Sequence, residues 1–94
     1  MRGKVKYVER NVWYRGNPWA RSEQERCTNT CAVLYNGDSV DIDEDDIRDY
    51  YDCSNITQSR IGELNDALHN VWIEYDEYDD DEGYYLCGSL SDYI

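Results

Sequence analysis

The stretch that decides the fold spans residues 31–42 and reads CAVLYNGDSVDI. Two short runs with strand character, 31–35 and 38–42, flank the dipeptide Asn36-Gly37. Asn-Gly tolerates the positive φ that a type I′ turn needs at both of its central residues. The sequence therefore predicts a β-hairpin that turns at these two residues.

Strand signals lie on both sides of this hairpin. Upstream, residues 5–14 are rich in Val, Tyr and Trp and predict a strand that ends at the Gly-Asn-Pro break of 16–18. Downstream, residues 71–78 alternate in polarity, a turn-like acidic run follows at 79–83, and 84–87 are again apolar. This pattern predicts a second hairpin with a very acidic tip, and a continuous helix through residue 78 is the alternative.

Two helices are expected between the hairpins. A short acidic one would begin after Asp43, whose side chain suits an N-cap, and would bury a stripe of Ile47, Tyr50 and Tyr51. The main helix would cover 57–70 with Thr57 as its N-cap. Apolar residues recur there at helical spacing, namely Ile61, Leu64 and Leu68.

These elements predict an α+β fold, in which an antiparallel sheet of four to five strands carries one or two helices on one face. The length of 94 residues predicts a single domain over 1–94 with a modest core. Ten tyrosines and three tryptophans, with no phenylalanine, argue against disorder. From them we expect a core built largely from aromatic rings.

Charge is the most unusual property of the chain. The formal net charge is -12, but it is divided unevenly. Residues 1–26 hold seven basic and three acidic residues, a net +4, whereas 27–94 hold two basic and eighteen acidic residues, a net -16. The basic segment is expected to neutralise acidic surface within the fold or to pair with it across a homodimer; a separate anion-binding role is the alternative.

The acidic residues gather in two blocks that interleave carboxylates with tyrosines. We predict that both blocks bind a partner. The first block consists of Asp41, Asp43, Glu44, Asp45, Asp46, Asp49, Tyr50, Tyr51 and Asp52. The second consists of Glu74, Tyr75, Asp76, Glu77, Tyr78, Asp79, Asp80, Asp81 and Glu82.

The spacing of carboxylates in the first block resembles that of a calcium-binding EF-hand loop. Carboxylates fall at five ligand positions of such a loop, namely Asp41, Asp43, Asp45, Asp49 and Asp52. However, Asp46 stands where the loop needs a glycine for its sharp turn, and Asp52 stands where a bidentate Glu is usual. A solvated acidic helix explains the same residues, so no metal ligand and no cofactor is predicted here.

The cysteines give no metal signature either. Cys27 and Cys31 form one close pair, and Cys53 and Cys87 are scattered, with His69 as the lone histidine. Zinc sites usually show two close ligand pairs. Free thiols that fill small apolar spaces are the default expectation, and a zinc site or disulfides are the alternatives.

Catalysis and membrane insertion are not indicated. The sequence contains no Gly-rich phosphate loop, and His69 beside Leu68 is more typical of a structural histidine than of a catalytic base. Carboxylate pairs have no specificity as a catalytic signal in a chain with 21 acidic residues. No apolar run approaches the ~20 residues of a membrane span, and the amino terminus lacks the apolar segment of a secretory signal. We therefore expect a non-enzymatic cytoplasmic protein.

Charge of this magnitude needs a further explanation, because solubility alone requires a net charge of only about 2 to 8 in a small domain. The excess destabilises the compact state through self-repulsion and so indicates a positively charged partner. Clefts lined with Lys and Arg for phosphates are abundant positive surfaces in cells. Carboxylates spaced along a strand or helix would form quasi-regular rows of negative charge, similar in kind to a phosphate backbone.

In size, charge and its two carboxylate-tyrosine blocks, the chain resembles small acidic phage proteins that mimic DNA and block restriction enzymes, CRISPR effectors or other host DNA-binding proteins. The resemblance is one of class, and the class has no common fold, so no residue roles can be transferred. It implies an inhibitor in the host cytoplasm, without direct nucleic-acid binding, that occupies the cleft of a basic nuclease or CRISPR effector. Two alternatives stay open: an acidic module that docks on a basic surface away from any nucleic-acid site, and a small calcium- or zinc-binding domain.

Overall fold

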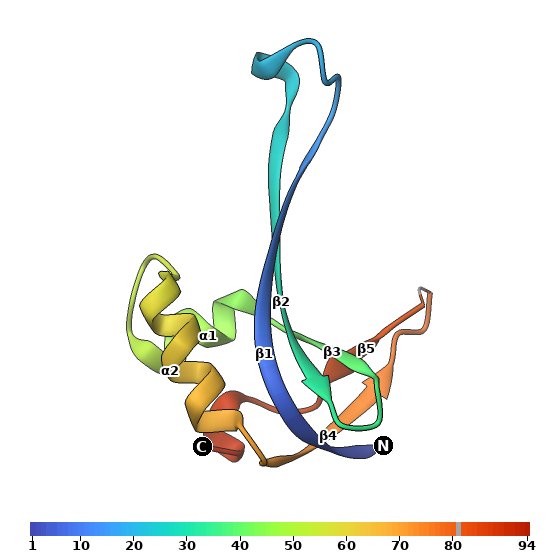
Figure 1. Cartoon of the computed structure of the whole chain (residues 1–94), viewed down its shortest axis with the longest axis vertical. Helices are drawn as coiled ribbons and strands as arrows, with labels where there is room; N and C mark the ends of the chain where they lie inside the picture. The colour runs from blue at the N-terminus through green and yellow to red at the C-terminus, as the bar shows by residue number, and fades with distance from the viewer. Residues whose placement is uncertain (81) are drawn as a thin grey trace.

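The computed structural model describes residues 1–80 and 82–94 and has the predicted α+β architecture (Figure 1). Its strands are β1 (Arg2–Arg15), β2 (Glu25–Leu34), β3 (Ser39–Ile42), β4 (Trp72–Glu77) and β5 (Tyr84–Leu86). Helix α1 (Glu44–Tyr51) and helix α2 (Gln58–Leu68) lie between β3 and β4. Two short 3-10 turns, η1 (Arg21–Glu23) and η2 (Leu90–Asp92), complete the described elements.

The five described strands close into a barrel in the order β1-β2-β3-β5-β4. Pairing is antiparallel as expected for β1-β2, β2-β3, β1-β4 and β4-β5. The β3-β5 pair differs from the expectation because it is parallel, with Val40 opposite Tyr84 and Asp41 opposite Tyr85. This short pairing joins the first hairpin to the second and leaves the body of the sheet without an open edge.

The hairpin predicted from residues 31–42 is confirmed, but its turn is not type I′. The amide of Gly37 donates to the carbonyl of Leu34, which makes Tyr35 and Asn36 the central residues of the turn. Gly37 then takes a positive φ of 94°, whereas Asn36 does not. A type I turn followed by a left-handed glycine is the usual alternative for longer hairpin loops, so one positive φ suffices.

Both predicted helices form where their caps indicate. The Asp43 side chain accepts a hydrogen bond from the amide of Asp45 at the start of α1, and Thr57 accepts one from Arg60 at the start of α2. In α2 the predicted apolar residues Ile61, Leu64 and Leu68 are buried, and the helix packs against β1. In α1 Ile47 is buried and Tyr51 lies half-buried against the core, but Tyr50 is exposed, which corrects the predicted stripe.

The second hairpin is also confirmed, so the helical alternative for residues 71–78 is wrong. Ile73 and Tyr75 on β4 face the core, while Trp72, Glu74 and Asp76 face outward. The predicted acidic tip falls between β4 and β5, with Asp81 outside the described residues.

The core is aliphatic, and the expectation of an aromatic core is wrong. Its buried members come from both hairpins and both helices, and Tyr75 is the one aromatic ring that is fully buried among the described residues. The other rings are exposed or only partly covered. The buried apolar residues are Val5, Val8, Ala32, Leu34, Val40, Ile42, Ile47, Ile56, Ile61, Leu64, Leu68, Ile73 and Leu90.

β1 and β2 continue far beyond the barrel as a two-stranded ribbon (Figure 1). We call residues 11–29 the arm; they include Asn11–Arg15, the tip with η1, and the first half of β2. The arm accounts for the elongated shape, with a longest dimension of 43 Å against 19 Å for the shortest. The rest of the chain, from which the arm projects, is called the body.

Candidate functional site

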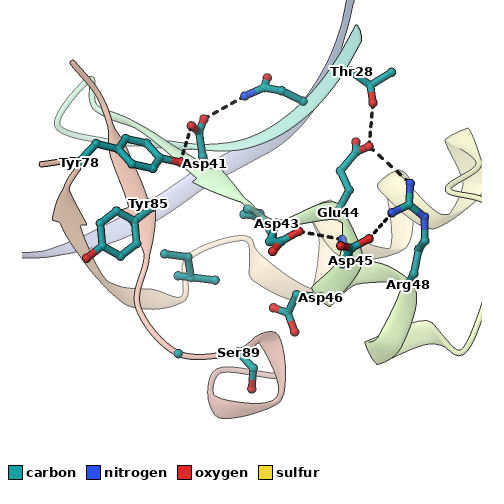
Figure 2. Close-up of a pocket in the computed structure, with 14 residues that line it drawn as sticks. Thr28, Asp41, Asp43, Glu44, Asp45, Asp46, Arg48, Tyr78, Tyr85 and Ser89 are labelled. Atoms are coloured by element: carbon teal, nitrogen blue, oxygen red, sulfur yellow. Dashed lines mark hydrogen bonds and ion pairs between the residues drawn. The ribbon is translucent and has the colours of Figure 1, made fainter. Parts of the chain in front are cut away.

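A hollow lies where β3, the amino end of α1, the second hairpin and the base of the arm meet (Figure 2). Its volume is about 720 Å³, and we call it the acidic groove. Five carboxylates and one guanidinium line it, a formal charge of -4. Its lining is Thr28, Asn29, Asp41, Ile42, Asp43, Glu44, Asp45, Asp46, Arg48, Tyr78, Tyr85, Leu86, Gly88 and Ser89.

Asp41 joins the two predicted blocks. The end of β3 presents its carboxylate between the arm and the second hairpin, and one oxygen accepts hydrogen bonds from Asn29 Nδ2 at 2.9 Å and Cys31 Sγ at 3.3 Å. The other oxygen accepts from the Tyr78 hydroxyl at 2.9 Å (Figure 2). Burial and this hydrogen bond to Asp41 raise the pKa of Tyr78 to about 12, so the phenol stays protonated and holds Asp41 in place.

The amino end of α1 supplies the opposite wall of the groove. Asp43 caps the helix, and Asp46 accepts a hydrogen bond from the amide of Leu90 at 2.9 Å, which ties η2 to α1. Asp45 is highly exposed and pairs with Arg48 at 2.8 Å. Acidic residues in the first turn of a helix interact favourably with its dipole, so this wall can concentrate negative charge without losing the helix.

Glu44, one of the residues predicted to bind a partner, makes several contacts inside the chain. Its carboxylate accepts from Arg10 Nε at 2.9 Å, from Thr28 Oγ1 at 2.8 Å and from Thr30 Oγ1 at 2.9 Å. Burial by itself would raise the pKa of Glu44, but the hydrogen bonds from these three residues outweigh it and lower the pKa. Its side chain is only 13% exposed, so Glu44 fastens the base of the arm to α1 and presents little surface.

Acidic surface continues past the groove onto the second hairpin. Asp79 and Asp80 line a smaller hollow with Tyr78 and Tyr85, the same two tyrosines that line the groove. The rings of Tyr78 and Tyr85 lie 5.2 Å apart, and Figure 2 shows them side by side across from α1. Asp76 and Asp79 lie close enough to Tyr85 to raise the pKa of its phenol. The tyrosine pair therefore connects carboxylates from both blocks.

The other predicted residues do not join this surface. Tyr75 is buried in the core, where its hydroxyl donates to Asp38 at 2.9 Å. Glu74 faces outward from the middle of β4, with its carboxylate oxygen 3.9 Å from Arg2 Nε. Apart from Asp81, which the structure does not describe, the remaining residues lie at the carboxyl end of α1 (Asp49, Tyr50, Tyr51, Asp52) or around Tyr84 (Glu77, Glu82).

The basic amino-terminal segment neutralises little of the acidic surface. Within the described residues, ion pairs of this segment reach only Glu44, from Arg10, and Glu74, from Arg2. In the groove, Asp41, Asp43 and Asp46 accept hydrogen bonds from neutral donors, and Asp45 has Arg48. The groove therefore keeps a net negative charge within the folded chain.

The cysteines and carboxylates of residues 1–80 and 82–94 are not grouped as metal ligands usually are. No group of three or more His, Cys, Asp or Glu side chains is arranged to hold a metal ion there. The four cysteines are unpaired thiols, and Cys31 is buried between Asn29 and Asp41. Burial raises the pKa of the Cys31 thiol to about 11, so it stays protonated and is a poor nucleophile.

Several residues of the groove and arm were not predicted from sequence. Tyr85 follows Tyr84 on β5, and strand alternation alone would have placed one of the two outward. Thr28 and Asn29 line the groove because the register between β1 and β2 places them at the base of the arm, which no local pattern indicates. Trp13, Tyr14 and Trp19 on the arm are exposed, contrary to the general expectation of an aromatic core.

Comparisons with protein families, with curated proteins and with solved structures found no match to this chain. Over the described residues, neither helix has the length and apolarity that a membrane span requires.

Proposed function

We propose that this chain is a non-catalytic inhibitor that mimics the charge of DNA and occupies the nucleic-acid-binding cleft of a nuclease or another DNA-binding protein. The acidic groove and the neighbouring Asp79 and Asp80 would accept the Lys and Arg side chains that otherwise hold phosphates. Acting in the host cytoplasm as a phage protein directed against a restriction or CRISPR system fits this activity.

One observation carries the proposal: carboxylates from both acidic blocks meet around Tyr78 and Tyr85, and of the five carboxylates in the groove the basic amino-terminal segment pairs only with Glu44. Each carboxylate has about four acceptor positions, so Asp41, Asp43 and Asp46 can accept further hydrogen bonds from a partner. Arg-carboxylate contacts are short and often bidentate, as Arg-phosphate contacts are. A cleft that binds phosphates therefore has the donors that this surface needs.

A second candidate, docking on a basic surface away from any nucleic-acid site, is favoured by the exposed tyrosine pair. Tyr78 and Tyr85 are each 38% exposed beside the carboxylates. Tyr is enriched among residues that dominate protein interfaces. In such a complex the rings would supply most of the binding energy and the carboxylates mainly the association rate.

The test starts with capture of partners from a bacterial lysate at low salt, followed by stepwise elution with salt and then with duplex DNA. Binding of the captured protein is then measured for Asp43→Asn with Asp45→Asn in the groove. Asn remains a good N-cap, so α1 is expected to stay folded. Loss of these two charges is expected to weaken binding about tenfold and to reduce its salt dependence.

Asp49→Asn with Asp52→Asn is the matched control. It removes the same charge from the same helix outside the groove, and Asn tolerates the left-handed conformation of Asp52. DNA mimicry predicts that the control pair binds nearly as well as wild type and that duplex DNA competes. A captured partner that binds the chain and DNA together would refute mimicry, and a larger loss from Tyr78→Ala or Tyr85→Ala than from the groove pair would favour the second candidate.

A further inference from the structure

The arm carries exposed aromatic rings with no partner in the described structure. Trp19 at the tip is 93% exposed, Tyr14 is 63% exposed and Trp13 is 39% exposed. Together these fractions amount to nearly two complete aromatic side chains, roughly 300–500 Å² per chain. Exposed apolar surface concentrated on one projecting element marks an interaction site.

The arm also lacks the support that usually stabilises a pair of strands. In the described structure β1 pairs with β4 only at Arg2–Lys4, and β2 pairs with β3 only at Thr30–Val33. Both edges of the ribbon are therefore free over residues 11–15 and 25–29, and beyond the contact of Thr28 with Glu44 at the base no second layer covers either face among the described residues. A two-stranded ribbon of this kind is at best marginally stable in water, so a packed second layer would stabilise it.

The charges of the arm and the groove are complementary. The arm carries Arg15, Arg21 and Arg26 against Glu23 and Glu25, a net charge of +1, and none of the three arginines forms an ion pair within the described chain. The acidic groove opens at the base of the same arm, where Thr28 and Asn29 line it, and keeps a net negative charge. The arginines near the arm tip and the carboxylates of the groove at the arm base are held apart by the length of the straight arm, so they cannot meet within one chain.

We propose that the arm docks on a second copy of the chain, in a two-fold dimer whose arms pack antiparallel. A two-fold axis through the middle of the arm places each tip beside the base of the partner's arm, where the partner's groove opens. Val12 and Tyr14 share one face with Thr28 and Arg26, which stand opposite them in the register, and this face is the side on which Arg10 and Thr30 contact α1. Packing this face against its copy brings Arg21 and Arg26 toward the partner's carboxylates.

The area that this packing would cover can be compared with that of known interfaces. Trp13 points to the other face of the ribbon, so Tyr14 and Trp19 are the rings involved, and covering them in both copies removes roughly 500–800 Å² from water. The smallest stable interfaces bury about 1,200 Å² in total, and the polar contacts between arm tip and groove would contribute the remainder. Because those contacts are ionic and lie at the rim, the dimer should weaken as salt is added.

This inference concerns a different partner from that of the proposed function and does not depend on it. If both hold, the arm of the second copy and the target's cationic cleft compete for one groove, so a target would bind the monomer. If no target exists, the dimer is still expected, and its measurement requires only the purified chain.

A charge swap tests the proposal by sedimentation velocity over a concentration series. The arm variant carries Arg21→Glu and Arg26→Glu; the groove variant carries Asp43→Ser, which keeps an N-cap, and Asp45→Lys. The arm variant sets acidic side chains against the acidic groove, and the groove variant reduces the formal charge of the groove lining from -4 to -1, so each alone is expected to dimerise at least about tenfold more weakly than wild type. An equimolar mixture restores one full contact, between the unchanged arm and the unchanged groove, and sets the acidic arm against the less acidic groove, so a heterodimer is expected to form.

Two tryptophan substitutions provide a matched comparison. Trp19→Ala removes a ring from the arm tip, whereas Trp72→Ala removes a ring that is 52% exposed on β4 of the body. Only Trp19→Ala is expected to weaken the dimer, and both chains should keep the wild-type circular dichroism spectrum. A wild-type chain that is monomeric at every concentration at low salt would overturn the proposal, as would an arm that binds duplex DNA as a monomer. Equal losses from the two substitutions, or a charge-swap mixture that stays monomeric, would overturn it as well.

Discussion

The body and the arm use the same residue types for opposite purposes. In the body, aliphatic side chains from four strands and both helices form most of the core, and most tyrosines lie at its rim or outside it. In the arm there is no core, and Trp13, Tyr14 and Trp19 are exposed on a ribbon one layer thick. The body is therefore stabilised by its own packing, whereas the arm depends on the body at its base and on a partner beyond it.

This contrast explains how a chain with so few aliphatic residues folds. Small aliphatic side chains fill a closed barrel of short strands, and burying each one contributes about 1.5–3 kcal/mol. Aromatic rings on the surface contribute little to folding but are well suited to interfaces, because they offer large area at low entropic cost. The tyrosine and tryptophan content is thus more informative about partners than about the core.

The largest expected effect contrasts a core residue with an arm residue. Leu64 is fully buried on α2, so Leu64→Ala should lower the free energy of unfolding by about 3 kcal/mol. Trp13→Ala removes a larger side chain from the arm, yet it should change the stability of the monomer by less than about 0.5 kcal/mol. Urea denaturation under conditions that keep the chain monomeric measures both. Comparable losses would mean that the arm is part of the cooperative core.

The next effect concerns the junction between the two regions. Glu44→Gln removes the negative charge of the carboxylate that accepts hydrogen bonds from Arg10, Thr28 and Thr30. The substitution should lower the free energy of unfolding by about 2 kcal/mol at neutral pH. The pKa of Glu44 is lowered in the folded chain, so its stabilisation is complete above the unfolded pKa of about 4.3 and is lost as the pH falls through the folded value. The difference between wild type and variant should therefore shrink below about pH 4.

Two measurements can contradict this account of Glu44. Urea unfolding of wild type and Glu44→Gln at a series of pH values gives the difference directly, and a difference that stays constant into the acid range would mean that the pKa of Glu44 is not lowered. Glu63→Gln is the control, because Glu63 forms an exposed pair with Arg60 on α2. Exposed pairs contribute little, so Glu63→Gln should cost less than about 0.5 kcal/mol.

Sequence reasoning succeeded where local chemistry decides structure and failed where distant contacts decide it. The caps Asp43 and Thr57 and the turn dipeptide Asn36-Gly37 act within a few residues, so the helices and hairpins were predictable. The parallel β3-β5 pair depends on how two hairpins meet, which no local pattern encodes. Aromatic residues were misplaced because exposure of a ring depends on which side of the barrel it occupies, and on whether its strand continues beyond the barrel.

The candidate site shows the same division. Composition located both acidic blocks, but it could not tell that Glu44 faces Arg10 or that Tyr75 lies in the core. The meeting of Asp41 with Tyr78, 37 residues apart, follows from the parallel pairing. The groove as a unit therefore becomes apparent only in the folded chain.

A smaller effect is expected within the groove, where Tyr78→Phe removes the hydroxyl that donates to Asp41. The free energy of unfolding should fall by about 1 kcal/mol, as for the loss of a typical hydrogen bond that is partly open to water. The folded pKa of Tyr78 is raised from 10.0 to about 12, so its stabilisation is complete below pH 10 and is lost as the pH rises toward 12. The stability difference between wild type and variant should therefore close over that range. A difference that persists at the alkaline end would show that the Tyr78-Asp41 contact is not what is lost.

The smallest effect compares one substitution in the two regions. Gly62 lies on the exposed face of α2, with open space where a Cβ would stand. Gly62→Ala should therefore raise the free energy of unfolding by about 0.5–1 kcal/mol. Gly16 begins the arm tip at a φ of +110°, and a Cβ there would come within 2.4 Å of the carbonyl oxygen of Glu23. Gly16→Ala should therefore disturb the tip, seen as faster amide exchange over residues 16–24, while the melting temperature changes little. If Gly16→Ala lowered the melting temperature more than Gly62→Ala raised it, the arm would be folding as one unit with the body, because a substitution at a freely standing tip cannot reach the cooperative core.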